Sequence, residues 1–156
     1  ASILITPEGE IHAGKRTSWC TPGKTTDNYG FAAWVQEHKE DLLKLGPGRH
    51  FGEWWGKGIN RGYGLEERRF SLFNTSRGRG NDPSCISYVP ILYHGLFSSQ
   101  SVEQCVLALK QHGSVAVPGW MTPEGVVVYH AAAGQLFKVT CEGDEKPKGI
   151  KEQENA

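Results

Sequence analysis

A chain of 156 residues, 38% of them hydrophobic, can bury one sizeable core, so we expect a single domain or a large part of one, without a second core. Seventeen basic residues balance seventeen acidic ones, which excludes a general attraction to nucleic acid or to an anionic membrane and leaves only local clusters for a polyanion. No apolar run reaches the roughly 20 residues of a membrane span, and the sequence does not begin with a signal-peptide pattern.

The four cysteines are far apart, without the spacing of a zinc site or of a disulfide framework. Free thiols are typical of a reducing compartment. We therefore expect a soluble protein of the cytoplasm that has no membrane partner.

The first half of the chain predicts a hairpin and then a helix. Residues 3–5 and 10–13 are β-type runs around a Pro/Gly turn at 6–9. Apolar residues at three- and four-residue spacing predict a helix over 31–45, which Asp27 or Asn28 can cap and which Gly46 ends. Strand-like runs follow at 50–55, 69–74 and 86–93.

The second half predicts one more helix and one more pair of strands. Ser101 and Gln104 form a capping box for a helix over 102–112, and Gly113 supplies its stop. Strands at 126–130 and 135–140 surround a turn of small residues, and a charged tail that we expect to be frayed begins at Glu142. Two main helices among hairpin-like strands indicate an α+β fold with largely antiparallel sheets.

Two carboxylates stand out. Glu53 lies in a strand of aromatic residues, where it either forms an internal salt bridge or accepts hydrogen bonds from a sugar; spacing alone leaves both open. Glu124 precedes the apolar run 126–129, which we expect to be buried on both faces, so its carboxylate would point into a cleft. Alone, a Glu-Gly pair is a weak motif.

The order of the motifs is more specific. Arg16, Phe-Gly-Glu at 51–53, Phe-Ser-Leu-Phe-Asn at 70–74, Glu-Gly-Val-Val-Val at 124–128 and Lys138 follow one another as in the covalent nucleotidyltransferases. The chain most closely resembles a bacterial and phage family of ATP-dependent RNA ligases, in which runs like those at 31–35, 52–56 and 61–65 also occur. The resemblance implies an adenylyltransferase (ATP-grasp-like) domain over 1–149, followed by a charged tail at 150–156.

The resemblance also implies roles for single residues. Arg16 would contact the nucleotide phosphates or the end to be joined, and Glu53 would bind the ribose hydroxyl. Phe73 would stack on adenine, with Phe70 as the alternative ring; the family more usually has Asp where Asn74 stands.

Two further roles belong to the second half of the chain. Glu124 would bind Mg²⁺, and Lys138 would touch the α-phosphate of ATP. Related enzymes usually have Lys-x-Lys here, whereas residues 136–140 contain one lysine. The cofactors implied are ATP and Mg²⁺.

The nucleophile of such enzymes is absent from the 156 residues. The family opens with Lys-x-Asp-Gly, whose lysine forms a lysyl-AMP. Lys15, Lys24 and Lys57 lack that context. Because the chain begins inside an apolar run at Ala1, we expect an N-terminal truncation just after the motif, and a chain that is inactive alone.

The implied function is the joining of RNA ends, a 5′-phosphate and a 3′-hydroxyl, through lysyl-AMP and RNA-adenylate intermediates. Two alternatives remain: a non-catalytic nucleotide- or RNA-binding remnant, and a DNA ligase or capping-type enzyme. The basic loop at 75–81 and Arg61 are further RNA-contact candidates, although an ordinary solvated loop is the favoured reading of each.

Overall fold

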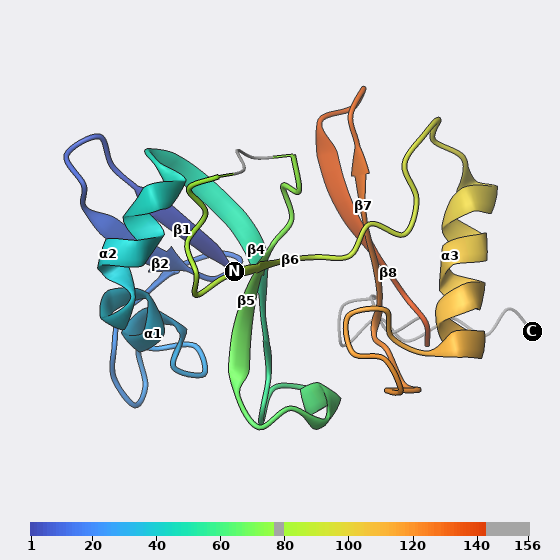
Figure 1. Ribbon diagram of the computed structural model, residues 1–156, viewed down its shortest axis with the longest axis horizontal. Coiled ribbons are helices and arrows are strands. Elements are labelled where there is room, and N and C mark those ends of the chain that lie inside the picture. Colours follow the sequence, from blue (N-terminus) through green and yellow to red (C-terminus); the bar gives the residue numbers. More distant parts are fainter. Residues whose placement is uncertain (77–79, 143–156) are drawn as a thin grey trace, which may run out of the picture. The chain divides into compact units, whose positions relative to one another are not determined.

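The computed structural model describes residues 1–76 and 80–142 (Figure 1). The chain divides into two compact units, Ala1–Pro90 and Ile91–Ala156, and each has its own cluster of buried side chains. Two clusters replace the single core that we expected from chain length. The predicted domain boundary at 149 and the tail at 150–156 lie outside the described residues.

The first unit contains a six-stranded sheet in the order β3-β2-β1-β4-β5-β6. Its strands are β1 Ser2–Ile5, β2 Ile11–Gly14, β3 Trp19–Cys20, β4 Gly48–Gly56, β5 Arg68–Leu72 and β6 Ser87–Tyr88. The predicted first hairpin is confirmed, since β1 and β2 pair antiparallel with Ser2 opposite Gly14. The strand predicted over 86–93 is wrong in extent: only two residues of it pair, in parallel with β5, and Pro90 cannot donate to a ladder.

The helix predicted over 31–45 is divided into three short pieces. These are α1 Phe31–Glu37, α2 Lys39–Leu42 and the 3-10 turn η1 Leu43–Leu45. At the break, His38 has φ −102° and ψ 16°, and its Nδ1 lies 2.9 Å from the Trp34 carbonyl. The predicted cap is confirmed for Asp27, whose carboxylate accepts from the N–H groups of Ala32 at 2.7 Å and Ala33 at 3.0 Å.

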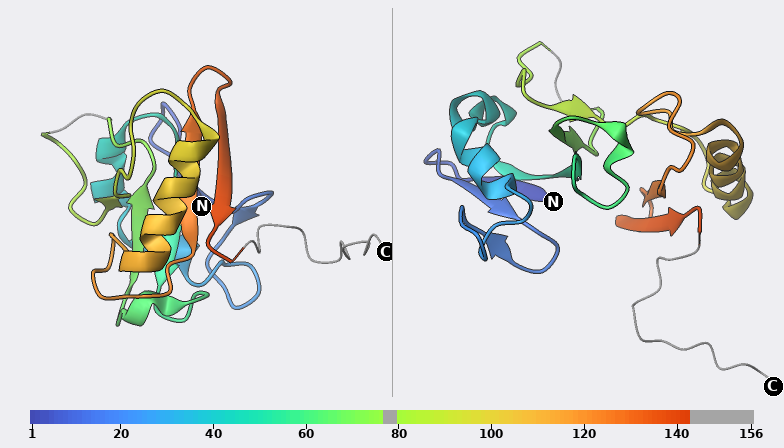
Figure 2. Two further views of the ribbon diagram at one scale, coloured as in Figure 1. Left: turned by 90° about the vertical axis from the view of Figure 1, so that its right-hand side faces the viewer. Right: turned by 90° about the horizontal axis from the view of Figure 1, so that it is seen from below.

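The core of the first unit lies between these helices and one face of the sheet (Figure 2). Phe31 of α1 is fully buried, and its ring centroid lies 5.3 Å from that of Trp54 and 5.4 Å from that of Phe70. Because side chains alternate along a strand, burial of Trp54 turns its neighbours Glu53 and Trp55 to the other face of β4.

The second unit is a hairpin with one helix. Its elements are α3 Ser99–His112, β7 Gly125–His130 and β8 Gln135–Thr140. The predicted hairpin and the stop at Gly113 are confirmed, but the capping box is wrong: Ser98 caps α3 by accepting from the Ser101 N–H at 3.1 Å. Within the described residues, we find no helix both long and apolar enough to span a membrane.

The helix α3 covers one face of the hairpin only. Val106 and Leu109 pack on Val126, whereas Val127 is 43% exposed and Tyr129 is 65% exposed. The expectation that this strand is buried on both faces is therefore wrong, because among the described residues of its unit a single helix covers one face of the two-stranded hairpin.

Candidate functional site

The face of β4 and β5 that points away from α1 and α2 carries a row of polar and aromatic residues, and we call it the open face. Phe51, Glu53 and Trp55 of β4 alternate with the buried residues of the strand. On β5, Ser71 lies opposite Glu53 and Arg69 lies opposite Trp55. Cross-strand partners share a face, so these side chains lie together on one face of the sheet, where Ser71 itself is buried.

Two of the predicted nucleotide-binding residues, Glu53 and Phe73, lie on this face. Phe73 directly follows β5, and its N–H donates to the Phe51 carbonyl at 3.0 Å, which continues the register that places Ser71 opposite Glu53. Glu53 and Phe73 are both partly exposed. The alternative ring, Phe70, is wrong as a stacking candidate, because it is fully buried against Phe31 on the opposite face of the sheet.

Polar groups that the sequence analysis did not single out fix this part of the sheet. Trp55 donates through Nε1 to the Ser71 hydroxyl at 2.9 Å, and that hydroxyl lies 2.7 Å from the Ser87 hydroxyl. The ring of Tyr63, in the 3-10 turn η2 Gly62–Gly64, meets Trp55 edge-on at 5.3 Å. The odd-even alternation of residues 69–73 predicts that Ser71 and Phe73 share a face, but that this face also carries Glu53 follows only from the pairing of β5 with β4.

Arg16 lies apart from these contacts. It is exposed in the turn between β2 and β3, which the Lys15 N–H closes by donating to the Ser18 carbonyl at 2.9 Å. Arg16 makes no hydrogen bond or ion pair with other described residues. Arg61 is partly exposed directly before η2. Arg77 and Arg79, in the basic loop considered above, lie outside the described residues.

The second unit joins the other two predicted residues. Lys138 of β8 forms an ion pair with Glu124, the residue directly before β7. The Cys141 N–H donates to the Glu124 carbonyl at 2.8 Å, which extends the ladder beyond the strand end. At Gly125 an added Cβ would lie 2.1 Å from the Val139 carbonyl, so the glycine permits the close approach of β8 that brings the carboxylate to the lysine.

The described residues offer one carboxylate, Glu124, for the implied cation. In the described part of the chain, no group of three or more His, Cys, Asp or Glu side chains is arranged to hold a metal ion by itself. Proteins often bind Mg²⁺ through one or two carboxylates, with substrate phosphates and water as the remaining ligands. Glu124, with 23% of its side chain exposed, fits the part of such a single carboxylate ligand.

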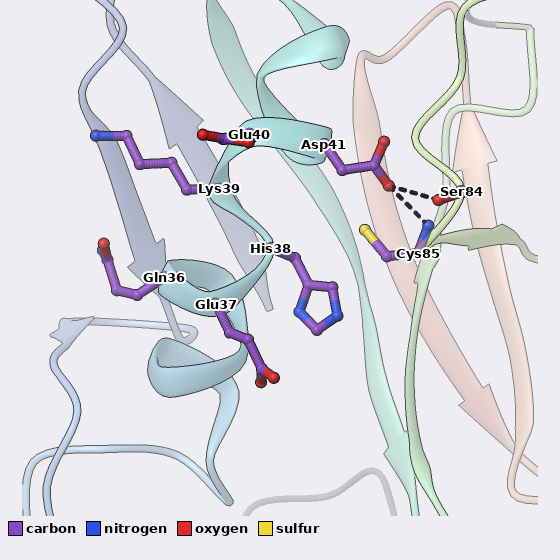
Figure 3. A pocket seen from close by; sticks show the side chains of 8 residues that line it. All are labelled: Gln36, Glu37, His38, Lys39, Glu40, Asp41, Ser84 and Cys85. Carbon is purple, nitrogen blue, oxygen red and sulfur yellow. Dashed lines mark hydrogen bonds between the residues drawn. The ribbon is translucent and has the colours of Figure 1, made fainter.

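A surface hollow of about 660 Å³ lies elsewhere on the first unit, lined by residues 36–41 with Ser84 and Cys85 (Figure 3). Asp41 accepts from the Ser84 hydroxyl at 2.9 Å and from the Cys85 N–H at 3.0 Å, and it pairs with Lys44 at 2.8 Å. Burial, reinforced by Asp41, raises the pKa of the Cys85 thiol to about 12. A thiol that stays protonated is a poor nucleophile, which argues against a catalytic role for Cys85. The Asp41 hydrogen bonds instead attach residues 84–85 to α2.

All four cysteines are free thiols. Comparisons with protein-family models, with curated proteins and with solved structures find no match to this chain. A function must therefore be inferred from the residues themselves and from the motif order.

Proposed function

We propose that this chain is the nucleotide-binding part of an RNA ligase-type nucleotidyltransferase. The observation that supports the proposal is that residues with adjacent implied roles lie on the same face of the sheet or in contact. Glu53 and Phe73, implied for ribose and adenine, lie on the open face, and Glu124 contacts Lys138, implied for metal and α-phosphate.

On the open face, the chemistry suits a nucleoside. The Glu53 carboxylate can accept hydrogen bonds from the two ribose hydroxyls, and the Phe73 ring offers a π-face to adenine. Hydrogen bonds from Trp55 to Ser71 and between Ser71 and Ser87 fix β4, which carries Glu53, against β5, which Phe73 follows.

In the second unit, the chemistry suits a phosphate. The Lys138 ammonium would offset the negative charge that grows on the α-phosphate as pyrophosphate leaves. Glu124 positions that ammonium by its ion pair. Bound Mg²⁺ would add charge neutralisation on the phosphates, with Glu124 as its protein ligand. Arg16 would supply a bidentate guanidinium to phosphates or to the RNA end.

The covalent step requires a lysine nucleophile in a Lys-x-Asp-Gly context, which residues 1–156 do not contain. We therefore propose that the chain as written binds ATP without forming a lysyl-AMP. A parent protein with the motif would join RNA carrying a 5′-phosphate to RNA carrying a 3′-hydroxyl. The free thiols favour the cytoplasm as its compartment.

Labelling tests this function. A full-length protein that carries the Lys-x-Asp-Gly motif should form a labelled protein band with α-labelled ATP and Mg²⁺. Lys138→Ala should reduce the rate about 100-fold or more, the scale of losing one charge-stabilising donor. Lys110→Ala, which removes an exposed lysine from α3 of the same unit, should leave the rate unchanged.

Three results would count against the proposal: an upstream sequence without the motif, no labelled band, or equal labelling in the Lys138 and Lys110 variants. A preference for GTP would assign the protein to the capping type instead. Nucleotide binding to the parent protein without any covalent label would favour the non-catalytic remnant.

A further inference from the structure

A second group of side chains on the sheet of the first unit is organised around Arg49, and we call Ser2, Trp19, Arg49 and Phe51 the Arg49 cluster. The Arg49 Nε donates to the Ser2 hydroxyl at 3.1 Å. Its guanidinium carbon lies 5.0 Å from the ring centroids of both Trp19 and Phe51. Three strands contribute to the cluster, with Ser2 of β1 opposite Phe51 of β4.

Backbone packing supports this arrangement. Gly14 of β2 lies opposite both Ser2 and Trp19, and an added Cβ would lie 2.7 Å from the Ser2 hydroxyl and 3.2 Å from the Trp19 ring. Glycine at this position therefore lets the indole lie over the neighbouring strand. Within the cluster Ser2 is buried, whereas Trp19 is 52% exposed and Phe51 is 47% exposed. The rings are held in place with much of their surface presented to solvent.

Among the described residues, the charge of Arg49 has no ion-pair partner. Its hydrogen bond goes to a neutral hydroxyl, and no carboxylate of the described residues forms an ion pair with it. Arg69, which lies over Trp55 on the same sheet, differs because it bonds Glu67 at 2.7 Å. Lys15 and Arg16, in the turn between β2 and β3, add further positive charge next to Trp19 in the chain. The surface is thus suited to an anionic ligand.

We propose that the Arg49 cluster binds single-stranded RNA. The Nη groups of Arg49 would donate to a backbone phosphate, and the exposed rings of Trp19 and Phe51 would stack on unpaired bases. Duplex RNA keeps its bases stacked inside the helix, so the rings favour a single strand. The choice of RNA rests on the proposed ligase function, for which this surface would hold a strand to be joined.

Salt-dependent binding of a fluorescent ten-nucleotide RNA to the chain, without ATP or Mg²⁺, tests the proposal. Arg49→Gln should weaken binding and lower the slope of log affinity against log salt by about 0.7, the contribution of one phosphate contact on a single strand. Trp19→Ala should weaken binding about fivefold or more with little change of slope. Lys39→Ala, an exposed lysine on α2 across the sheet, should change neither.

A further variant separates the charge of Arg49 from its planar shape. Arg49→Lys keeps the charge but loses the planar group, so it should retain the slope of the wild type with reduced affinity. Circular dichroism should show a native spectrum for each variant. The proposal is overturned by an absence of RNA binding in the wild type, by an unchanged slope in Arg49→Gln, or by equal affinity for duplex RNA.

Failure of the proposed function has a different signature. If the parent protein gives no lysyl-AMP but the chain binds RNA through Arg49, the ligase assignment fails and the binding surface stands. If the label forms and Arg49→Gln binds RNA as well as the wild type does, the ligase assignment stands and the RNA-binding role of the Arg49 cluster fails.

Discussion

The two units of the chain differ in how firmly they hold the residues of the candidate site. In the first, the open face belongs to a six-stranded sheet whose other face is covered by α1 and α2 (Figure 2). Phe31 is fully buried in the core between these helices and the sheet. In the second, Glu124 and Lys138 lie at a two-stranded hairpin, and the unit's cluster of buried residues is small: Val106 and Leu109 of α3 with Val126 of β7. Two strands alone are marginal in water, so the packing of α3 is essential there.

Under the proposed function, this difference predicts that the first unit fixes the base and the sugar, whereas the second binds the phosphate and the cation. A base and a sugar need fixed partners at set positions, and the first unit offers strands in a well-packed sheet. An ion pair at the end of a small hairpin can open and exchange partners with a phosphate or a cation more readily. We expect substitutions in the two cores to separate these properties.

The largest effect should come from the core of the first unit. Phe70→Ala removes a fully buried ring that packs on Phe31, and we expect a loss of about 3–5 kcal/mol in the free energy of unfolding. Phe97→Ala is the matched control in the second unit, since its ring is 51% exposed, and it should cost less than about 1 kcal/mol. Urea denaturation measures both. Equal losses would contradict the burial on which the comparison depends.

A smaller and more local effect should follow Leu109→Ala in α3. The side chain is 5% exposed, but its cluster is small and can collapse around the gap, so we expect about 2 kcal/mol. Hydrogen exchange should accelerate in α3, β7 and β8, while amides of β1 and β4 keep their protection. Leu107→Ala, an exposed leucine of the same helix, serves as the control. Accelerated exchange throughout the first unit would show that the two units unfold together.

Local patterns predicted the elements well where short-range chemistry decides. The turn at 6–9, the Asp27 cap and the strands of the second hairpin were all readable because each depends on residues close in sequence. The break at His38 was not, since a side chain bonding back to Trp34 competes with helix continuation in a way that apolar spacing does not reveal. Ser98 and Ser101 both satisfy the cap pattern, and only the structure distinguishes them.

The site was predictable in part for the same reason. Motif order singled out Glu53, Phe73, Glu124 and Lys138; the first two lie on one face of the sheet, and the last two form an ion pair. Choosing between Phe70 and Phe73 required the face of β5, which depends on pairing with β4. The Arg49 cluster was missed altogether because it joins Ser2, Trp19 and Phe51 across strands that are not adjacent in sequence.

The smallest expected effect concerns Asp41, which ties residues 84–85 to α2 inside the first unit. Its bond to Lys44, followed by those to Ser84 and Cys85, holds the pKa of the Asp41 carboxyl well below its usual range. A lowered folded-state pKa means that the stabilisation is complete above the unfolded value of about 3.9 and is lost as the pH falls further towards the folded value.

Asp41→Asn should therefore lower the free energy of unfolding modestly at pH 7, and the difference from wild type should shrink at pH 3. Hydrogen exchange at the Cys85 amide, which donates to Asp41 at 3.0 Å, should accelerate in the variant while α3 and β7 stay unchanged. Glu40→Gln, an exposed neighbour on the same helix, controls for the loss of one negative charge. A difference between Asp41→Asn and wild type that grows towards low pH would contradict the sign of this linkage, and faster exchange in α3 would mean that residues 84–85 also stabilise the second unit.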